Sequence, residues 1–263
     1  MEPDDAFHRA FCRACRFGDL PSTQEAIATG RLTVEQLNEG LKYATRMRQV
    51  GIATLLFDAG ASVSTWTVDS LPGEYLQQDP RIVRLFLERG LDPNARLSTG
   101  EPLLPMFSNP ECAALLLSAG ADPNRPGAKG IPPIARAIVG TREPSTSLIE
   151  LYLAHGAKLE STLLFYSLMP RVPQHELMTR FLLDKGVDPN VTSNDWGTPL
   201  HLAVRVGKVN LAKMLLEAGA DPTVVSCGRK IGSLTPAQVA EEDSPVETRE
   251  EILRLLESYS GQP

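Results

Sequence analysis

The residues best suited to metal or redox chemistry are two cysteines near the N-terminus, Cys12 and Cys15, separated by Arg and Ala. A pair with this spacing can supply two thiolates to zinc or form a redox disulfide, but a structural zinc site needs a second ligand pair. No further C-x-x-C or H-x-x-H pair follows, and Cys112 and Cys227 are isolated. We therefore expect Cys12 and Cys15 to pack as small apolar residues between helices, and we predict no metal and no cofactor.

The other candidate catalytic residues are scattered. The four histidines lie far apart, so their spacing pairs none of them with a nucleophile. The strings G-x-S-x-G, G-x-x-x-x-G-K-[ST] and G-x-G-x-x-G do not occur. Asp92, Asp122 and Asp188 lie 30 and 66 residues apart, whereas a calcium loop needs alternating oxygen ligands within one short segment. We therefore expect a protein that is not an enzyme, in which these aspartates form turns.

The elements that position these side chains recur along the chain. Six apolar strings end on glycine, which commonly closes a helix in the left-handed conformation. They are LLFDAG at Gly60, LFLERG at Gly90, LLLSAG at Gly120, LYLAHG at Gly156, FLLDKG at Gly186 and MLLEAG at Gly219. Successive glycines are 30, 30, 36, 30 and 33 residues apart. A period of this length indicates a stack of repeated helical units.

The segments after and before these helices also recur. Four related strings begin at the helix-ending glycines: GLDPN at Gly90, GADPN at Gly120, GVDPN at Gly186 and GADPT at Gly219. Proline forces the residue before it into an extended conformation. Gly197-Thr-Pro-Leu-His-Leu-Ala203 begins another helix, with Pro199 suited to the first turn. Together with Leu215–Asp221, this segment resembles an ankyrin repeat, whose signature contains TPLH. The resemblance extends over about residues 5–258 and implies a structural role for His201, whose ring would tie neighbouring turns together.

The expected fold is therefore all-α, an ankyrin-repeat solenoid of about eight helix-turn-helix units with short finger loops, forming a single domain over residues 1–263. The units are expected near 5–30, 33–60, 66–90, 98–120, 130–156, 160–186, 194–219 and 231–258. The end units are expected to act as caps with a polar outer face.

Several units depart from the pattern. Thr33-Val-Glu-Gln36 reads as a capping box that starts a helix directly. Pro102 and Pro105 are expected to shorten the inner helix of the fourth unit. Residues 141–146 and 169–173 are expected to lengthen the turns of the fifth and sixth units.

Charge and composition limit the class of partner. The net charge is −6, whereas a dedicated nucleic-acid binder is normally basic. The sequence contains no run of about 18 apolar residues, so we expect no membrane-spanning segment. The acidic N-terminal segment does not resemble a signal peptide. The four cysteines do not make a disulfide framework. We expect a monomeric protein with an intracellular, cytoplasmic or nuclear location that binds neither nucleic acid nor membrane.

These observations predict a protein–protein interaction module, a scaffold, adaptor or regulator, that binds its partner on the concave surface of inner helices and fingers. Trp66 and Trp196 precede the inner-helix residues Leu71 and Leu200, so we expect both tryptophans on projecting fingers, as interface anchors or as packed side chains.

A stripe of arginines suggests the chemistry of the partner. Ala14, Ala44 and Ala203 occupy the small-residue position of three inner helices, and an arginine follows each of them by two residues: Arg16, Arg46 and Arg205. We expect Arg16 and Arg46 to sit side by side and to accept an acidic peptide or helix. The remaining candidate partner-binding residues are Lys129, Arg136, Asn194 and Asp195.

The sequence is also compatible with a second function. The protein could be an enzyme or a small-molecule-binding protein that uses a pocket in the irregular central repeats. Four prolines would interrupt the regular groove there: Pro105, Pro110, Pro170 and Pro173.

Overall fold

The computed structural model describes residues 3–72, 78–140 and 144–260 of the 263-residue chain. Within these residues the regular structure consists of fifteen α-helices and one 3₁₀ helix, with two isolated β-bridges and no strand. Contacts divide the chain into two compact units. Unit 1 comprises residues 1–134 with 154–156, and unit 2 comprises residues 135–153 with 157–263. None of the described helices has the length and apolar character needed to cross a membrane.

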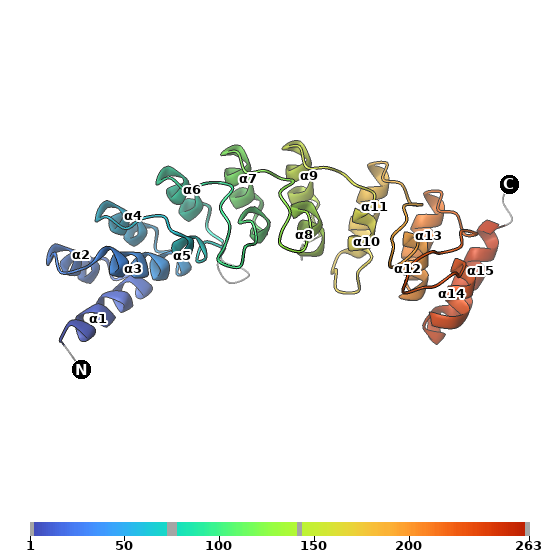
Figure 1. Ribbon diagram of the computed structural model, residues 1–263, viewed down its shortest axis with the longest axis horizontal. Coiled ribbons are helices and arrows are strands. Elements are labelled where there is room, and N and C mark those ends of the chain that lie inside the picture. The colour runs from blue at the N-terminus through green and yellow to red at the C-terminus, as the bar shows by residue number, and fades with distance from the viewer. Residues whose placement is uncertain (1–2, 73–77, 141–143, 261–263) are drawn as a thin grey trace. The chain divides into compact units, whose positions relative to one another are not determined.

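Unit 1 contains four consecutive helix pairs (Figure 1). The first helix of each pair, the inner helix, is α1 (Pro3–Phe17), α3 (Val34–Arg46), α5 (Thr65–Val68) or the 3₁₀ helix η1 (Leu104–Met106). The second, outer helices are α2 (Leu20–Ala28), α4 (Val50–Asp58), α6 (Pro80–Glu88) and α7 (Pro110–Ser118). Helix α3 packs between α1 and α5, and α4 packs between α2 and α6. The core therefore lies between two helical layers and includes Leu41, Leu56, Phe86 and Leu103.

Unit 2 contains the remaining pairs. Its inner helices are α8 (Pro133–Gly140), which starts two residues before the unit boundary, α10 (Leu163–Ser167), α12 (Pro199–Arg205) and α14 (Pro236–Asp243). Its outer helices are α9 (Ser147–Ala154), α11 (His175–Asp184), α13 (Val209–Glu217) and α15 (Val246–Ser260). Helix α12 contacts both α10 and α14, and α13 contacts both α11 and α15. The expected eight helix pairs are thus confirmed, whereas a single domain over residues 1–263 stays a prediction.

The recurring DPN segments join successive pairs through their asparagines. In one of them, Asp92 accepts a hydrogen bond from the Asn94 backbone N–H at 2.9 Å, so the expected turn forms. The Asn94 side chain donates to the carbonyl of Gly120 at 2.9 Å and accepts from the N–H of Asp122 at 2.8 Å. Asn190 makes the same pair of bonds with Gly219 and Asp221. Each asparagine therefore satisfies backbone groups at the end of the next outer helix, where helical partners are lacking.

The third inner helix differs from its predicted position. It spans Thr65–Val68, whereas the repeat spacing placed its start near Leu71. Ser64 and Thr67 form a capping box, in which each side chain accepts a hydrogen bond from the other residue's backbone N–H. This cap starts the helix early, and Pro72 follows soon after it. Trp66 consequently lies in a helical turn and not on a finger.

The other predicted departures are confirmed where the structure describes them. Thr33 and Gln36 form the expected capping box at the start of α3. The fourth inner element is the three-residue helix η1. In the sixth unit, residues 168–174 separate α10 from α11, whereas only residues 206–208 separate α12 from α13, so the turn expected over 169–173 is longer. The turn predicted over residues 141–146 begins with 141–143, which lie outside the described residues.

Candidate partner-binding site

Trp66 lies in a small hollow on the inner helices of unit 1. Its side chain is 53% exposed, although tryptophan is highly buried on average. Lys42 of α3 places its ammonium nitrogen 4.3 Å from the centroid of the indole ring, a cation–π geometry. The hollow has an empty volume of about 420 Å³ and is lined by Lys42, Arg46, Trp66, Asp69 and Ser70, here called the Trp66 cluster.

Two neighbouring inner helices supply the Trp66 cluster. Lys42 and Arg46 are four residues apart on α3, so they lie on one face of that helix, against which α5 packs. The carboxylate of Asp69 accepts a hydrogen bond of 2.8 Å from the backbone N–H of Ser98 and is thereby directed to the next finger. The hollow therefore combines two cations with an exposed aromatic ring, an arrangement suited to an acidic ligand.

Trp196 occupies the predicted finger position in unit 2. It lies in the turn closed by the bridge between Ser193 and Gly197. Its ring is half-buried and has two cations near it, with the Lys230 nitrogen at 4.2 Å and the Arg205 guanidinium carbon at 5.4 Å from the centroid. We call Trp196, Arg205 and Lys230 the Trp196 cluster. The ring is thus partly covered by the next finger, which contributes Lys230.

Most polar groups around Trp196 already have partners within the chain. Arg205 donates to the carbonyl of Lys230 at 2.5 Å and lies 3.8 Å from the carboxylate of Asp243. Asp195 accepts two hydrogen bonds from the Arg229 guanidinium, at 2.8 and 3.1 Å. The backbone carbonyl of Asn194 accepts from the Arg229 N–H at 2.9 Å. Arg205 is therefore engaged by groups of its own chain.

Similar proteins share these repeats. The family model for ankyrin repeats (3 copies) matches residues 137–226. The ankyrin repeat domain of human ASB11 superposes with a TM-score of 0.55 at 18% identity, covering 96% of this chain and 98% of that chain. An ankyrin repeat domain from Acinetobacter baumannii gives a TM-score of 0.54 at 26% identity and covers 67% of this chain and 92% of that chain. The chain is an ankyrin-repeat protein.

The sequence relatives match mainly over short segments. Mouse 2-5A-dependent ribonuclease is 45% identical over 60 residues, which are 22% of this chain and 8% of the ribonuclease. Mouse ankyrin repeat and SOCS box protein 16 is 37% identical over 90 residues, or 34% of this chain and 20% of that protein. The putative ankyrin repeat protein FPV230 of fowlpox virus is 28% identical over 158 residues, which cover 56% of this chain and 81% of the viral protein. The chain thus spans a small part of the two mouse proteins.

The remaining predicted site residues of this ankyrin-repeat protein lie outside the two tryptophan clusters. Arg16 is exposed, and its guanidinium carbon lies 5.6 Å from the ring centroid of Phe17. Its charge also opposes the rise in the pKa of Tyr43, which burial causes, so Arg16 lies near α3. Lys129 is exposed in a turn of unit 1, and Arg136 is half-buried on α8 in unit 2.

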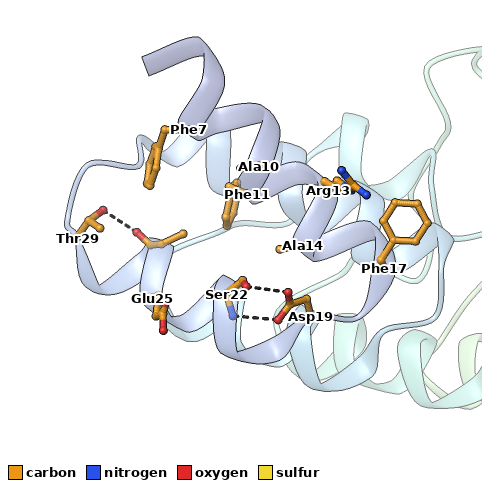
Figure 2. Close-up of a pocket in the computed structure, with 11 residues that line it drawn as sticks. Phe7, Ala10, Phe11, Arg13, Ala14, Phe17, Asp19, Ser22, Glu25 and Thr29 are labelled. Atoms are coloured by element: carbon orange, nitrogen blue, oxygen red, sulfur yellow. Dashed lines mark hydrogen bonds between the residues drawn. The ribbon is translucent and has the colours of Figure 1, made fainter. Parts of the chain in front are cut away.

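An apolar groove lies along the first helix pair of the ankyrin-repeat protein. Figure 2 shows it between α1 and α2, with Phe7, Phe11 and Phe17 along α1. Asp19 caps α2 at its edge by accepting hydrogen bonds from the N–H and hydroxyl of Ser22, at 3.0 and 2.7 Å. The groove has an empty volume of about 1150 Å³.

The prolines of the alternative pocket lie elsewhere. Pro105 is in η1 and Pro110 begins α7 in unit 1, while Pro170 and Pro173 lie between α10 and α11 in unit 2. None of them lines the groove of the first pair or the Trp66 hollow.

Sequence reasoning missed the two lysines of the clusters. Lys42 lies one helical turn before Arg46, so extending the arginine stripe by a turn would have found it. Lys230 follows Trp196 by 34 residues, about one repeat, which is the separation expected between neighbouring fingers.

Proposed function

We propose that this ankyrin-repeat protein is a non-enzymatic interaction module that binds an acidic segment of a partner protein on the Trp66 cluster. Ankyrin repeat domains are generally protein-interaction modules, which supports the class of function. The observation that carries the specific site is the exposed Trp66 ring with the Lys42 ammonium 4.3 Å from its centroid.

Trp66 leaves a large apolar surface in contact with water, and a partner that covers this surface gains binding free energy. Tryptophan is enriched among the residues that dominate binding energy, and burying an aromatic ring removes a large apolar area from water. The ring is also held in place, because its short helix is fixed by the Ser64–Thr67 capping box and by the buried Thr67. A preorganised side chain loses little conformational entropy when a partner covers it.

The charges of the Trp66 cluster favour an acidic partner. Lys42 and Arg46 face the same hollow, and an arginine fork can bind a carboxylate through two parallel hydrogen bonds. Asp69 also lines the hollow and offsets one of the two positive charges, so the hollow keeps an excess of one positive charge. A peptide or helix with acidic side chains beside an apolar one would fit both features.

Other properties of the proposal follow from the same residues. We propose a monomer whose binding of the partner at the Trp66 cluster needs no cofactor. We also propose that it binds no membrane and no nucleic acid, the latter because the net charge is −6. We also propose an intracellular location in the cytoplasm or nucleus. The four cysteines are free, which supports a reducing compartment.

Affinity purification with quantitative mass spectrometry tests the proposed site. Trp66→Ala should reduce capture of the partner by roughly 30-fold or more, the effect of losing about 2 kcal/mol at a hot spot. Lys42→Glu combined with Arg46→Glu should weaken capture by reversing the charge. Thermal unfolding should change little, because the replaced side chains are wholly or partly exposed.

Arg84→Glu provides the matched control. Arg84 is exposed on the outer helix α6, so the same charge reversal there should leave capture intact. If Trp66→Ala captures the partner as well as the wild type does, the Trp66 cluster is not the binding site.

A further inference from the structure

Three side chains with metal-binding atoms meet where the first two inner helices pack. His8 and Cys12 are one turn apart on α1, and Glu39 projects from α3. The Nε2 atom of His8 lies 3.4 Å from the Cys12 sulfur and 3.2 Å from Oε2 of Glu39. One ligand atom from each residue falls within 4.8 Å of the other two. We call these residues the His8–Cys12–Glu39 cluster.

The two short separations match those of a tetrahedral zinc site. Zinc bonds of about 2.0–2.3 Å to nitrogen, oxygen and sulfur place neighbouring ligand atoms about 3.3–3.6 Å apart. The observed 3.2 and 3.4 Å lie close to this range without any movement of the helices. A single ion could therefore contact all three side chains after small rotamer adjustments.

The close packing of the two helices explains why the ligands meet. Gly40 follows Glu39, and a Cβ atom at this position would lie 2.7 Å from the Phe11 ring and 3.1 Å from the Cys15 sulfur. The glycine therefore lets α3 approach α1 closely, which brings the Glu39 carboxylate within reach of His8.

The surroundings suit an accessible metal site. The side chains of His8 and Glu39 are 25% and 30% exposed, so an ion can enter from solvent. The Tyr43 hydroxyl donates a hydrogen bond of 3.5 Å to Oε1 of Glu39, the oxygen that does not face His8. Such a contact orients a ligating carboxylate.

We propose that His8, Cys12 and Glu39 bind one Zn²⁺ ion, with the fourth position held by water or by a donor from a partner. The set of one imidazole, one thiolate and one carboxylate suits zinc, because the hard cations Mg²⁺ and Ca²⁺ prefer oxygen ligands alone. On binding, the Cys12 thiol gives its proton to solvent and the zinc–sulfur bond replaces the S–H bond. The ion joins the first and second repeats and is independent of the Trp66 cluster.

This site differs from the cysteine pair that the sequence suggested. Cys15 is fully buried, and burial raises the pKa of its thiol to about 12. Cys12 is half-buried, and its sulfur lies near different side chains, those of His8 and Glu39. The second and third ligands thus come from a histidine one turn away and from the next repeat.

Titration of the reduced 263-residue chain with Co²⁺ tests the proposal. Co²⁺ substitutes for Zn²⁺ and reports thiolate ligation by a sulfur-to-cobalt charge-transfer band. We expect one Co²⁺ per chain with this band, and displacement of the ion by Zn²⁺. Cys12→Ser should abolish the band. Glu39→Gln and His8→Asn should each weaken Zn²⁺ affinity roughly tenfold or more in competition with a chromophoric chelator.

Cys227→Ser is the matched control, since Cys227 is exposed and lies outside the cluster. The band should persist in this variant with unchanged affinity, and circular dichroism should show wild-type helix content for each variant. Absence of Co²⁺ binding, a band that survives Cys12→Ser, or affinity that is unaffected by both Glu39→Gln and His8→Asn would overturn the proposal. If Cys12→Ser does not fold, the Glu39→Gln and His8→Asn affinities decide.

Discussion

His201 uses both nitrogens of its ring: Nδ1 bonds the start of its own helix, and Nε2 joins the seventh helix pair to the eighth. Nδ1 accepts from the Thr198 backbone N–H at 3.2 Å and lies 2.8 Å from the Thr198 hydroxyl. Nε2 lies 3.0 Å from the carbonyl of Leu234, 33 residues away. Because Nδ1 accepts from an N–H, the neutral tautomer with hydrogen on Nε2 fits this network. Burial lowers the pKa of His201, which agrees with a neutral ring.

The lowered pKa of His201 makes stability depend on pH. Its folded pKa is below the unfolded value, so the unfolded state takes up the proton first, and the free energy of unfolding falls as pH drops below about 6.5. We expect His201→Gln to remove part of this slope and to lower stability near neutral pH by about 1–3 kcal/mol, since buried polar groups lose partners. Urea denaturation at about pH 7.5 and about pH 5.5 measures both effects. If the wild type and His201→Gln lose the same free energy of unfolding between the two pH values, the prediction is wrong.

The role of a single residue was predictable where it belongs to a local sequence motif. The resemblance at TPLH implied that His201 ties neighbouring turns, and the structure confirms it. The partners of Asn94 and Trp66, and the His8 partner of Glu39, lie about one repeat away or on the neighbouring helix. Such contacts depend on the register between repeats, which the sequence spacing places only to within a few residues.

Among the elements, the fingers of unit 2 pack backbone against backbone. Gly228 is buried, and a Cβ atom there would lie 2.5 Å from the N atom of Gly197 and 2.8 Å from the carbonyl carbon of Asp195. The N–H of Lys230 donates to the Asp195 carbonyl at 2.9 Å. Neighbouring fingers can pair this closely only because residue 228 has no side chain.

Replacing Gly228 tests the importance of this finger contact. Gly228→Ala should lower the free energy of unfolding by about 1–3 kcal/mol, because backbone atoms must move to admit the methyl group. Gly51→Ala is the control: Gly51 is exposed on α4 and a Cβ there meets no atom within 4 Å. That change should raise stability by about 0.5 kcal/mol through helix propensity. Equal stability of Gly228→Ala and the wild type in chemical denaturation would show that the fingers adjust freely.

The inner helices show what the sequence could and could not predict at this scale. Proline spacing correctly predicted the short fourth inner helix, because proline restricts its neighbours directly. The third inner helix was misplaced, since the capping box at Ser64 outweighed the repeat spacing measured back from Gly90. Local capping therefore decided where that helix begins, and with it the position of Trp66.

At the scale of the whole molecule, the sequence period predicted the number of helix pairs but not the division into two compact units. The glycines that end the outer helices mark the end of each repeat. They recur on both sides of the unit boundary, so they do not indicate where the division falls. The boundary falls within α8 of the fifth pair, so it does not follow the lengths of the inner helices. Those lengths range from fifteen residues in α1 to three in η1.

Repeats contact mainly their neighbours, so local stability should follow the quality of each pair. In unit 2, the first six residues of α12 are buried and His201 joins α12 to the next pair, so amides of α12 and α13 should exchange slowest. In unit 1, α5 and η1 have four and three residues and should exchange much faster than α3. The five-residue α10 should likewise exchange faster than α12. Hydrogen–deuterium exchange with peptide-level mass spectrometry measures this order, and uniform protection across the pairs would mean that the chain opens as one cooperative body.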